Sequence, residues 1–194
     1  VICGFGRTGK WFGCDYFDIK ADLMPIAKGL SSGYLPIGGV LVSDRVATGL
    51  IEKGGEFNHG FTYSGHPVAA AAAIANLNIL MDEGIVDRVD KVIGPYTAEK
   101  WQPLTEHPLV GEARIIGLIG AIELVKDKDT RQFFADRGEV GTICRDICIE
   151  NGLVMRAVED TMIMSPPLCI SEGEIDDLVG LLTRCLDLTA EKVL

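Results

Sequence analysis

The chain has 194 residues, of which 47% are hydrophobic, and a formal charge of −10 at pH 7. This length allows one large domain or parts of two, with enough apolar residues for a buried core. Nucleic acids and anionic membranes select basic surfaces, so the acidic balance argues against both as partners. The longest apolar stretch, residues 68–81, is interrupted by Asn76 and Asn78 and is too short to cross a bilayer.

The first third of the chain alternates short apolar runs with glycine-rich turns. It opens on "VIC", a strand-like run without a methionine or a polar lead-in, and we expect a fragment of a longer protein. Residues 23–27 and 38–43 are apolar runs flanked by glycine and proline, which is typical of buried strands in a parallel α/β sheet. Residues 44–54 predict a short helix that begins at Asp44.

Helical patterns follow as far as residue 101. Ser64 as N-cap and Pro67 just inside the start predict a helix through the alanine-rich segment to Met81, and a second helix is expected over 85–101. The composition then changes at 102–108. We therefore expect residues 1–102 to be the C-terminal part of a large α/β domain, and residues 103–194 to be a small α+β domain.

Within the expected α+β domain, residues 113–125 predict a strand pair or one long bent strand. Residues 138–152 predict a helix that stops at Gly152. Two short strands, 153–158 and 161–166, are expected to form a hairpin around "EDT". The chain closes on an amphipathic helix over 171–194, with Ser171 and Glu174 as a capping box.

Six cysteines are dispersed along the chain without a C-x-x-C pair. Dispersed thiols are typical of a reducing compartment, so the sequence predicts a cytoplasmic protein. Cys144 and Cys148 lie one helical turn apart, but none of the three histidines is near them. No metal site is expected.

The segment "GFGRTG" (4–9) fits the dinucleotide fingerprint G-x-G-x-x-G, with Asp22 eighteen residues beyond Gly4. Extended to Lys10, it also fits the start of a phosphate loop. Both motifs need a helix that begins at the last glycine, and "KWFGCDYFDI" is a poor helix former. A glycine-rich turn at the mouth of a pocket is the preferred interpretation, and a dinucleotide-binding oxidoreductase is kept as an alternative.

Lys28 is the only charged residue between Asp22 and Asp44, and it follows an apolar strand. Open α/β sheets bind ligands at the carboxyl ends of their strands. An amine that is partly desolvated there is nucleophilic and condenses with aldehydes to a Schiff base. The alternative is a structural lysine whose amine reaches solvent.

The segment "HGFTYSGHP" (59–67) places Thr62 just before the helix that is expected near Pro67. Amide groups at a helix start, the positive end of the helix dipole and nearby hydroxyls together suit a phosphate. The alternative is a plain N-cap. An amine nucleophile and an anion cradle on one domain suggest pyridoxal 5'-phosphate as cofactor.

Three segments, "GFGRTG", residues 21–43 and residues 57–77, closely resemble the class III aminotransferases of the pyridoxal-phosphate fold type I superfamily. "GLIGAIELV" (117–125) and "SPPL" (165–168) extend the resemblance over the whole chain. It implies that Lys28 carries the cofactor and that Thr62 binds the phosphate in the partner subunit of a homodimer. It also implies that the aspartate that holds the pyridine nitrogen precedes Val1, so we expect the C-terminal portion of the enzyme.

Arg156 stands alone on an apolar strand, where a guanidinium is costly unless it pairs with an anion. It can clamp a substrate carboxylate, or it can pair with Glu159 or Asp160. Residues 153–168 are similar to the ω-amino-acid:pyruvate aminotransferase branch, which implies that Arg156 binds the carboxylate of an α-keto acid. We expect amino transfer from an ω-amino acid or amine to an α-keto acid, pyruvate above all. A decarboxylase or aminomutase of the same family is the alternative.

Overall fold

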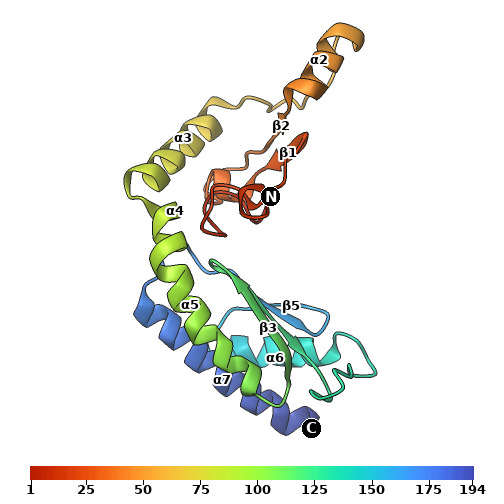
Figure 1. Ribbon diagram of the computed structural model, residues 1–194, viewed down its shortest axis with the longest axis vertical. Coiled ribbons are helices and arrows are strands. Elements are labelled where there is room, and N and C mark those ends of the chain that lie inside the picture. Colours follow the sequence, from red (N-terminus) through yellow and green to blue (C-terminus); the bar gives the residue numbers. More distant parts are fainter. The chain divides into compact units, whose positions relative to one another are not determined.

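The computed structural model describes residues 1–194, whose internal contacts divide them into two compact units, Val1–Asp87 and Arg88–Leu194 (Figure 1). Both of the clusters of buried apolar side chains lie in the C-terminal unit. No single helix is long and apolar enough to span a membrane. Only the bent pair of α3 (Pro67–Asp82) and residues Ile85–Glu106 has, when taken together, the length and composition of a span.

The N-terminal unit opens with a turn. The backbone N–H of Phe5 donates to the Trp11 carbonyl at 2.6 Å, and that of Gly6 donates to the Lys10 carbonyl at 3.2 Å. The backbone of this segment therefore closes locally on residues 10 and 11, and the prediction of a strand at "VIC" is wrong. The next element is the single-turn helix α1 (Gly13–Tyr16).

Two strands follow, β1 (Leu23–Ile26) and β2 (Gly39–Val42), at the predicted positions. They pair with each other in antiparallel fashion, and every residue of β2 is exposed. The prediction of buried parallel strands is therefore wrong for this pair. The connection between them contains only the 3₁₀ turn η1 (Lys28–Leu30), whereas parallel strands are usually joined by a crossover that contains an α-helix.

Two helices complete the N-terminal unit. Helix α2 (Asp44–Lys53) begins where it was predicted. Helix α3 begins at Pro67 as predicted, but its N-cap is His66 rather than Ser64. Gly65 turns the chain with a φ of +71°, and the Ser64 hydroxyl accepts from the backbone N–H of Phe61 at 2.9 Å instead of capping the helix.

The predicted helix over 85–101 is present, with a π-helical turn inside it. Helix α4 (Ile85–Arg88) continues through the π turn η2 (Val89–Ile93) into α5 (Gly94–Trp101) and the 3₁₀ turn η3 (Gln102–Glu106). Gly94 donates to the Val89 carbonyl, and a Cβ at Gly94 would lie 2.3 Å from that oxygen. Pro95 follows and has no N–H to donate, so the regular helical pattern is interrupted here.

Val89, Ile93 and Trp101 of this helix are fully buried against residues of the C-terminal unit. The contacts of the chain therefore divide at Asp87 and Arg88, not at 102 and 103. The domain boundary at 102–103 stays a prediction, but α5 packs with the C-terminal unit.

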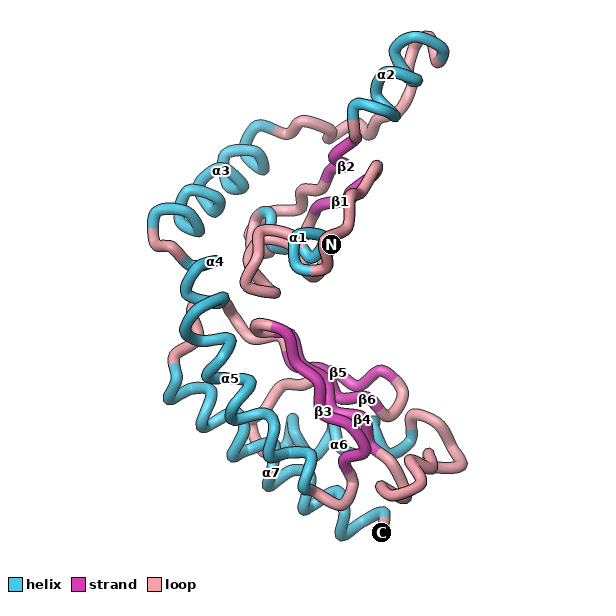
Figure 2. Tube along the Cα trace, in the orientation of Figure 1, coloured by secondary structure: helices cyan, strands magenta, loops and turns pink.

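The C-terminal unit is an antiparallel sheet with helices on one face (Figure 2). The strands are β3 (Val110–Ile116), β4 (Ile119–Leu124), β5 (Arg156–Val158) and β6 (Thr161–Met164), in the order β3-β4-β6-β5. Alternate residues such as Ile122 and Met162 are buried in one core with α5, α6 (Glu139–Glu150) and α7 (Glu172–Val193). The predicted α+β architecture, the strand pair, the hairpin and the Ser171–Glu174 capping box are confirmed.

Candidate active site

Lys28 lies two positions after the last residue of β1, as the first residue of the η1 turn. Its φ is +47°, and Ser32 has a φ of +49°, so two residues other than glycine adopt the left-handed conformation within five positions. This conformation costs a residue with a side chain roughly 1–2 kcal/mol, and it persists only where the surrounding contacts hold it. The backbone that carries the Lys28 amine is therefore held in a strained turn.

The Lys28 side chain is exposed, and it forms no hydrogen bond or ion pair with any other residue of the chain. The expected partial desolvation of its amine is thus absent from these 194 residues. Within these residues the side chain matches the alternative, a lysine whose amine reaches solvent, and the role of Lys28 in binding a cofactor stays a prediction. What the structure offers is a free primary amine on a fixed backbone, which fits covalent attachment of an aldehyde cofactor.

One side of the Lys28 turn packs against the glycine-rich turn of residues 4–9. A Cβ at Gly29 would lie 3.0 Å from the Phe5 Cβ and 3.4 Å from the Gly4 carbonyl oxygen. Phe5 is itself buried and has a φ of +58°. The absence of a side chain at Gly29 therefore allows the two turns to approach closely.

The other side of the turn is bound by Asn76 of α3. Its amide nitrogen donates to the Gly29 and Leu30 carbonyls at 2.9 and 3.1 Å, and its Oδ1 accepts from the Ser32 hydroxyl at 2.6 Å. In the sequence, Asn76 is conspicuous only because it interrupts an apolar run. That interruption, a polar residue in an alanine-rich helix, was the available signal.

The glycine-rich turn does not bind a phosphate in the manner of a nucleotide fingerprint. No helix begins at Gly9, and the next one, α1, has only four residues. Asp22, the acid that the fingerprint would assign to a ribose, accepts hydrogen bonds from Arg45 and Ser43, which hold the pKa of its carboxyl at about 2. The dinucleotide alternative therefore has no support in the structure.

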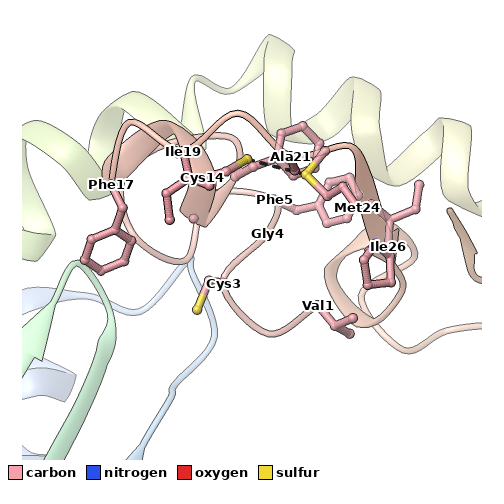
Figure 3. A pocket seen from close by; sticks show the side chains of 13 residues that line it. Val1, Cys3, Gly4, Phe5, Cys14, Phe17, Ile19, Ala21, Met24 and Ile26 are labelled. Atoms are coloured by element: carbon pink, nitrogen blue, oxygen red, sulfur yellow. Dashed lines mark hydrogen bonds between the residues drawn. The ribbon is translucent and has the colours of Figure 1, made fainter. Parts of the chain in front are cut away.

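The glycine-rich turn instead lines an apolar cavity of about 290 Å³ with α1 and β1 (Figure 3). Phe5 and Phe12 meet edge to face there with ring centroids 5.4 Å apart, and the Cys14 thiol contacts the Met24 sulfur at 3.5 Å. The prediction that this turn borders a pocket is confirmed. Neither Lys28 nor Thr62 lines the cavity, so it is separate from the predicted cofactor site.

Thr62 lies in the turn that precedes α3, and both it and its neighbours Phe61 and Tyr63 are exposed. Its hydroxyl forms no hydrogen bond within the chain, and the first turn of α3 begins five residues later. A free hydroxyl beside a helix N-terminus fits the predicted role in phosphate binding.

The structure does not bring Thr62 and Lys28 of the same chain together. The Lys28 turn meets α3 at Asn76, nine residues after Pro67. At 1.5 Å of rise per residue, this is about 14 Å along the helix from the end that follows Thr62. Thr62 therefore precedes the start of α3, whereas the Lys28 turn contacts the second half of this helix.

Arg156 begins β5 on the face of the sheet that the helices leave uncovered. Residues directly opposite one another on neighbouring strands share a face of the sheet. Arg156 of β5 lies opposite Ile163 of β6. Ile163 lies opposite Ala121 of β4, and Ala121 lies opposite Arg114 of β3. The two arginines thus stand at the two ends of one row. Arg114 contacts Glu112 at 2.9 Å and Glu123 at 3.4 Å, whereas Arg156 is exposed and pairs with no acid of the chain.

The alternative of a structural ion pair for Arg156 is wrong, because both candidate acids are engaged elsewhere. Glu159 pairs with Arg137 at 2.8 Å, and the buried Asp160 accepts from the backbone N–H of Gly141 at 2.9 Å. A Cβ at Gly141 would lie 2.0 Å from the Glu159 carbonyl oxygen, so only glycine permits this contact. These bonds fix the hairpin that carries Arg156 to the start of α6.

We expect Asp160→Ala to lower the free energy of unfolding by about 1–3 kcal/mol, because the buried Gly141 amide loses its only acceptor. Urea unfolding of the enzyme that contains this chain measures the effect. Glu159→Gln is the matched control: its pair with Arg137 is exposed, and a loss of only about 0–1 kcal/mol is expected. Equal losses for the two variants would contradict the assigned role of Asp160.

No group of three or more histidine, cysteine, aspartate or glutamate side chains among residues 1–194 is arranged to hold a metal ion. All six cysteines are unpaired. The predicted site residues therefore offer a free amine at Lys28, a free hydroxyl at Thr62 and a free guanidinium at Arg156. Lys28 and Thr62 belong to the N-terminal unit, and Arg156 belongs to the C-terminal unit.

Comparison with known proteins agrees with this set of groups. A family model described as aminotransferase class-III matches residues 1–186. The putrescine–pyruvate aminotransferase of Pseudomonas aeruginosa is 58% identical over 194 residues, which are 100% of this chain and 42% of that protein. The chain thus spans less than half the length of this relative.

Solved transaminase structures also match over the whole chain. A transaminase with L-ala superposes with a TM-score of 0.93 at 40% identity and is covered over 46% of its length. The PMP-bound form of an aminotransferase from Vibrio fluvialis superposes with a TM-score of 0.93 at 34% identity and is covered over 43%. The chain therefore belongs to the class III aminotransferases and has part of their pyridoxal-phosphate-dependent fold.

Proposed function

We propose that the enzyme containing this chain transfers an amino group from an ω-amino acid or an amine to pyruvate. The observation that carries the proposal is the free amine of Lys28 on a strained turn at the end of β1. The 58% identity to a protein named putrescine–pyruvate aminotransferase supports the choice of substrates. A solved relative bound to L-alanine, the amino form of pyruvate, supports the acceptor.

Pyridoxal phosphate fits the residues present. Lys28 would attach its aldehyde, and Thr62 with the start of α3 would bind its phosphate. When bound, this cofactor supplies an electron sink for the carbanion that forms at the substrate carbon. Lys28 would be the group that takes the proton from that carbon, as general base, and delivers it to the former aldehyde carbon of the cofactor, as general acid.

We further propose a homodimer in which Thr62 serves the site of the partner subunit. The distance along α3 between the Thr62 turn and the Lys28 turn supports this arrangement. Phe61 and Tyr63, on either side of Thr62, are 78% and 80% exposed. Phe57 is 71% exposed as well, and the ring of His59 contacts both Phe57 and Phe61, so the exposed aromatic side chains form a cluster, as is typical of a protein interface.

Arg156 would bind the carboxylate of the keto acid. Its guanidinium is exposed and unpaired, and the hairpin beneath it is fixed by Asp160. A guanidinium can donate two parallel hydrogen bonds to one carboxylate, which adds geometric selectivity to charge. A simple amine has no carboxylate to occupy it. We also propose the cytoplasm as location, on the evidence of six unpaired cysteines.

The experiment is an amino-transfer assay with putrescine or β-alanine as donor and pyruvate as acceptor, followed by chromatography of the products. Formation of alanine in a one-to-one ratio with donor consumed is the expected result. Release of CO₂ without alanine would instead indicate the decarboxylase alternative, and conversion of one amino acid to its positional isomer without an acceptor would indicate an aminomutase.

A further inference from the structure

We propose that Asn76 is a positioning residue for Lys28: its side chain holds the turn from which the Lys28 amine extends. The proposal rests on the proposed function, because it concerns how readily that amine reaches the cofactor aldehyde. Asn76 lies in the middle of α3, and the turn that it binds lies 46 to 47 residues earlier in the chain.

Asn76 forms hydrogen bonds with polar groups that have no hydrogen-bond partner within the turn. Leu30 and Ser31 donate their amides back to Ala27 and Lys28, but the carbonyls of Gly29 and Leu30 accept from no backbone amide. The two N–H groups of the Asn76 side chain satisfy these two carbonyls, and its oxygen accepts from Ser32. Both donors and one acceptor position of the amide are thus used on a single four-residue segment.

The backbone bounded by these contacts is the strained part of the connection between β1 and β2. Lys28 stands immediately before the segment with a φ of +47°, and Ser32 ends it with a φ of +49°. Strained conformations of this kind persist where surrounding contacts over-determine them. Phe5 packs against Gly29 from one side, and Asn76 supplies the polar contacts from the other.

Asn78 offers a matched control on the same helix. It is the same residue type two positions along, is exposed and forms no hydrogen bond within the chain. Because residues two apart on a helix do not share a face, Asn78 cannot substitute for Asn76. Both variants replace an asparagine of α3 with alanine, but only Asn76→Ala removes the contact with the Lys28 turn.

The test compares two forms of the cofactor bound to cofactor-free enzyme. Pyridoxal phosphate can condense with the Lys28 amine, with release of one water, whereas pyridoxamine phosphate has no aldehyde and binds without this bond. Asn76→Ala should lower the affinity for pyridoxal phosphate on the order of tenfold, which is the loss expected when several hydrogen bonds are removed. The affinity for pyridoxamine phosphate should change by less than about threefold. Asn78→Ala should change neither.

A double-mutant cycle separates positioning from general stability. In a Lys28→Ala background, Asn76→Ala should have no further effect on the affinity for pyridoxal phosphate, because the amine that it positions is gone. If Asn76→Ala does not fold, Ser32→Ala can replace it, because it removes one of the three hydrogen bonds of Asn76 at an exposed residue. It should lower the affinity for pyridoxal phosphate more than that for pyridoxamine phosphate, but by a smaller factor than Asn76→Ala.

Equal weakening of both cofactor forms by Asn76→Ala, in either background, would overturn the positioning role while leaving the proposed function standing. Failure of the unmodified enzyme to bind either form would overturn the proposed function itself. Selective weakening of the aldehyde form that disappears without Lys28 supports both.

Discussion

Lys28→Ala is expected to reduce steady-state amino transfer by at least about 10²- to 10⁴-fold, the range that positioned acid–base groups contribute. No other lysine lies between residues 21 and 52, so the turn that follows β1 holds no second amine. The side chain is exposed and makes no contact that the fold needs, which means that the loss should appear in turnover rather than in stability.

The control for this variant is Lys20→Ala, an exposed lysine of the same unit without a hydrogen bond or an ion pair. It should retain normal turnover. Pyridoxamine phosphate should still bind to the Lys28→Ala enzyme, because its phosphate contacts do not involve the amine. Near-normal steady-state transamination by Lys28→Ala would remove this residue from the catalytic step.

Arg156→Ala is expected to raise the KM for pyruvate on the order of tenfold to a hundredfold. The loss of a charge-assisted contact to a carboxylate is about 1.5–3 kcal/mol, which corresponds to this range. The KM for putrescine, which has no carboxylate, should change much less. Initial rates measured with each substrate varied in turn give the two values separately.

Arg114→Ala is the matched control, because it stands at the other end of the same row on the same face of the sheet. Its guanidinium is already paired with Glu112 and Glu123, so it is not free to bind a substrate. The KM for pyruvate should stay unchanged in this variant. Equal increases for pyruvate and putrescine in Arg156→Ala would identify a structural arginine instead.

Elements that depend on interactions between near neighbours could be predicted from the sequence. The β5–β6 hairpin turns within the two residues Glu159 and Asp160, and the start of α7 is determined by Ser171 and Glu174, three positions apart. The stop of α6 near Gly152, whose φ is +84°, follows from one residue. Each of these signals is contained in a few consecutive positions.

Features that depend on distant partners could not be predicted. An apolar run does not indicate whether the neighbouring strand is parallel or antiparallel, so the antiparallel pairing of β1 with β2 was not predicted. Arg156 had two acids within four residues, but Glu159 is occupied by Arg137, 22 positions earlier. The contact of Asn76 with Gly29 spans 47 residues and rests on the packing of α3 against the turn.

The central claim, that Lys28 carries the cofactor, is tested most directly by trapping it. The enzyme loaded with pyridoxal phosphate is reduced with borohydride, digested, and its peptides are weighed by mass spectrometry. We expect loss of the yellow colour and a stable pyridoxyl phosphate adduct on the peptide that contains Lys28, and no such adduct in Lys28→Ala. An adduct on another lysine, or no adduct in an enzyme that transfers amino groups, would contradict it.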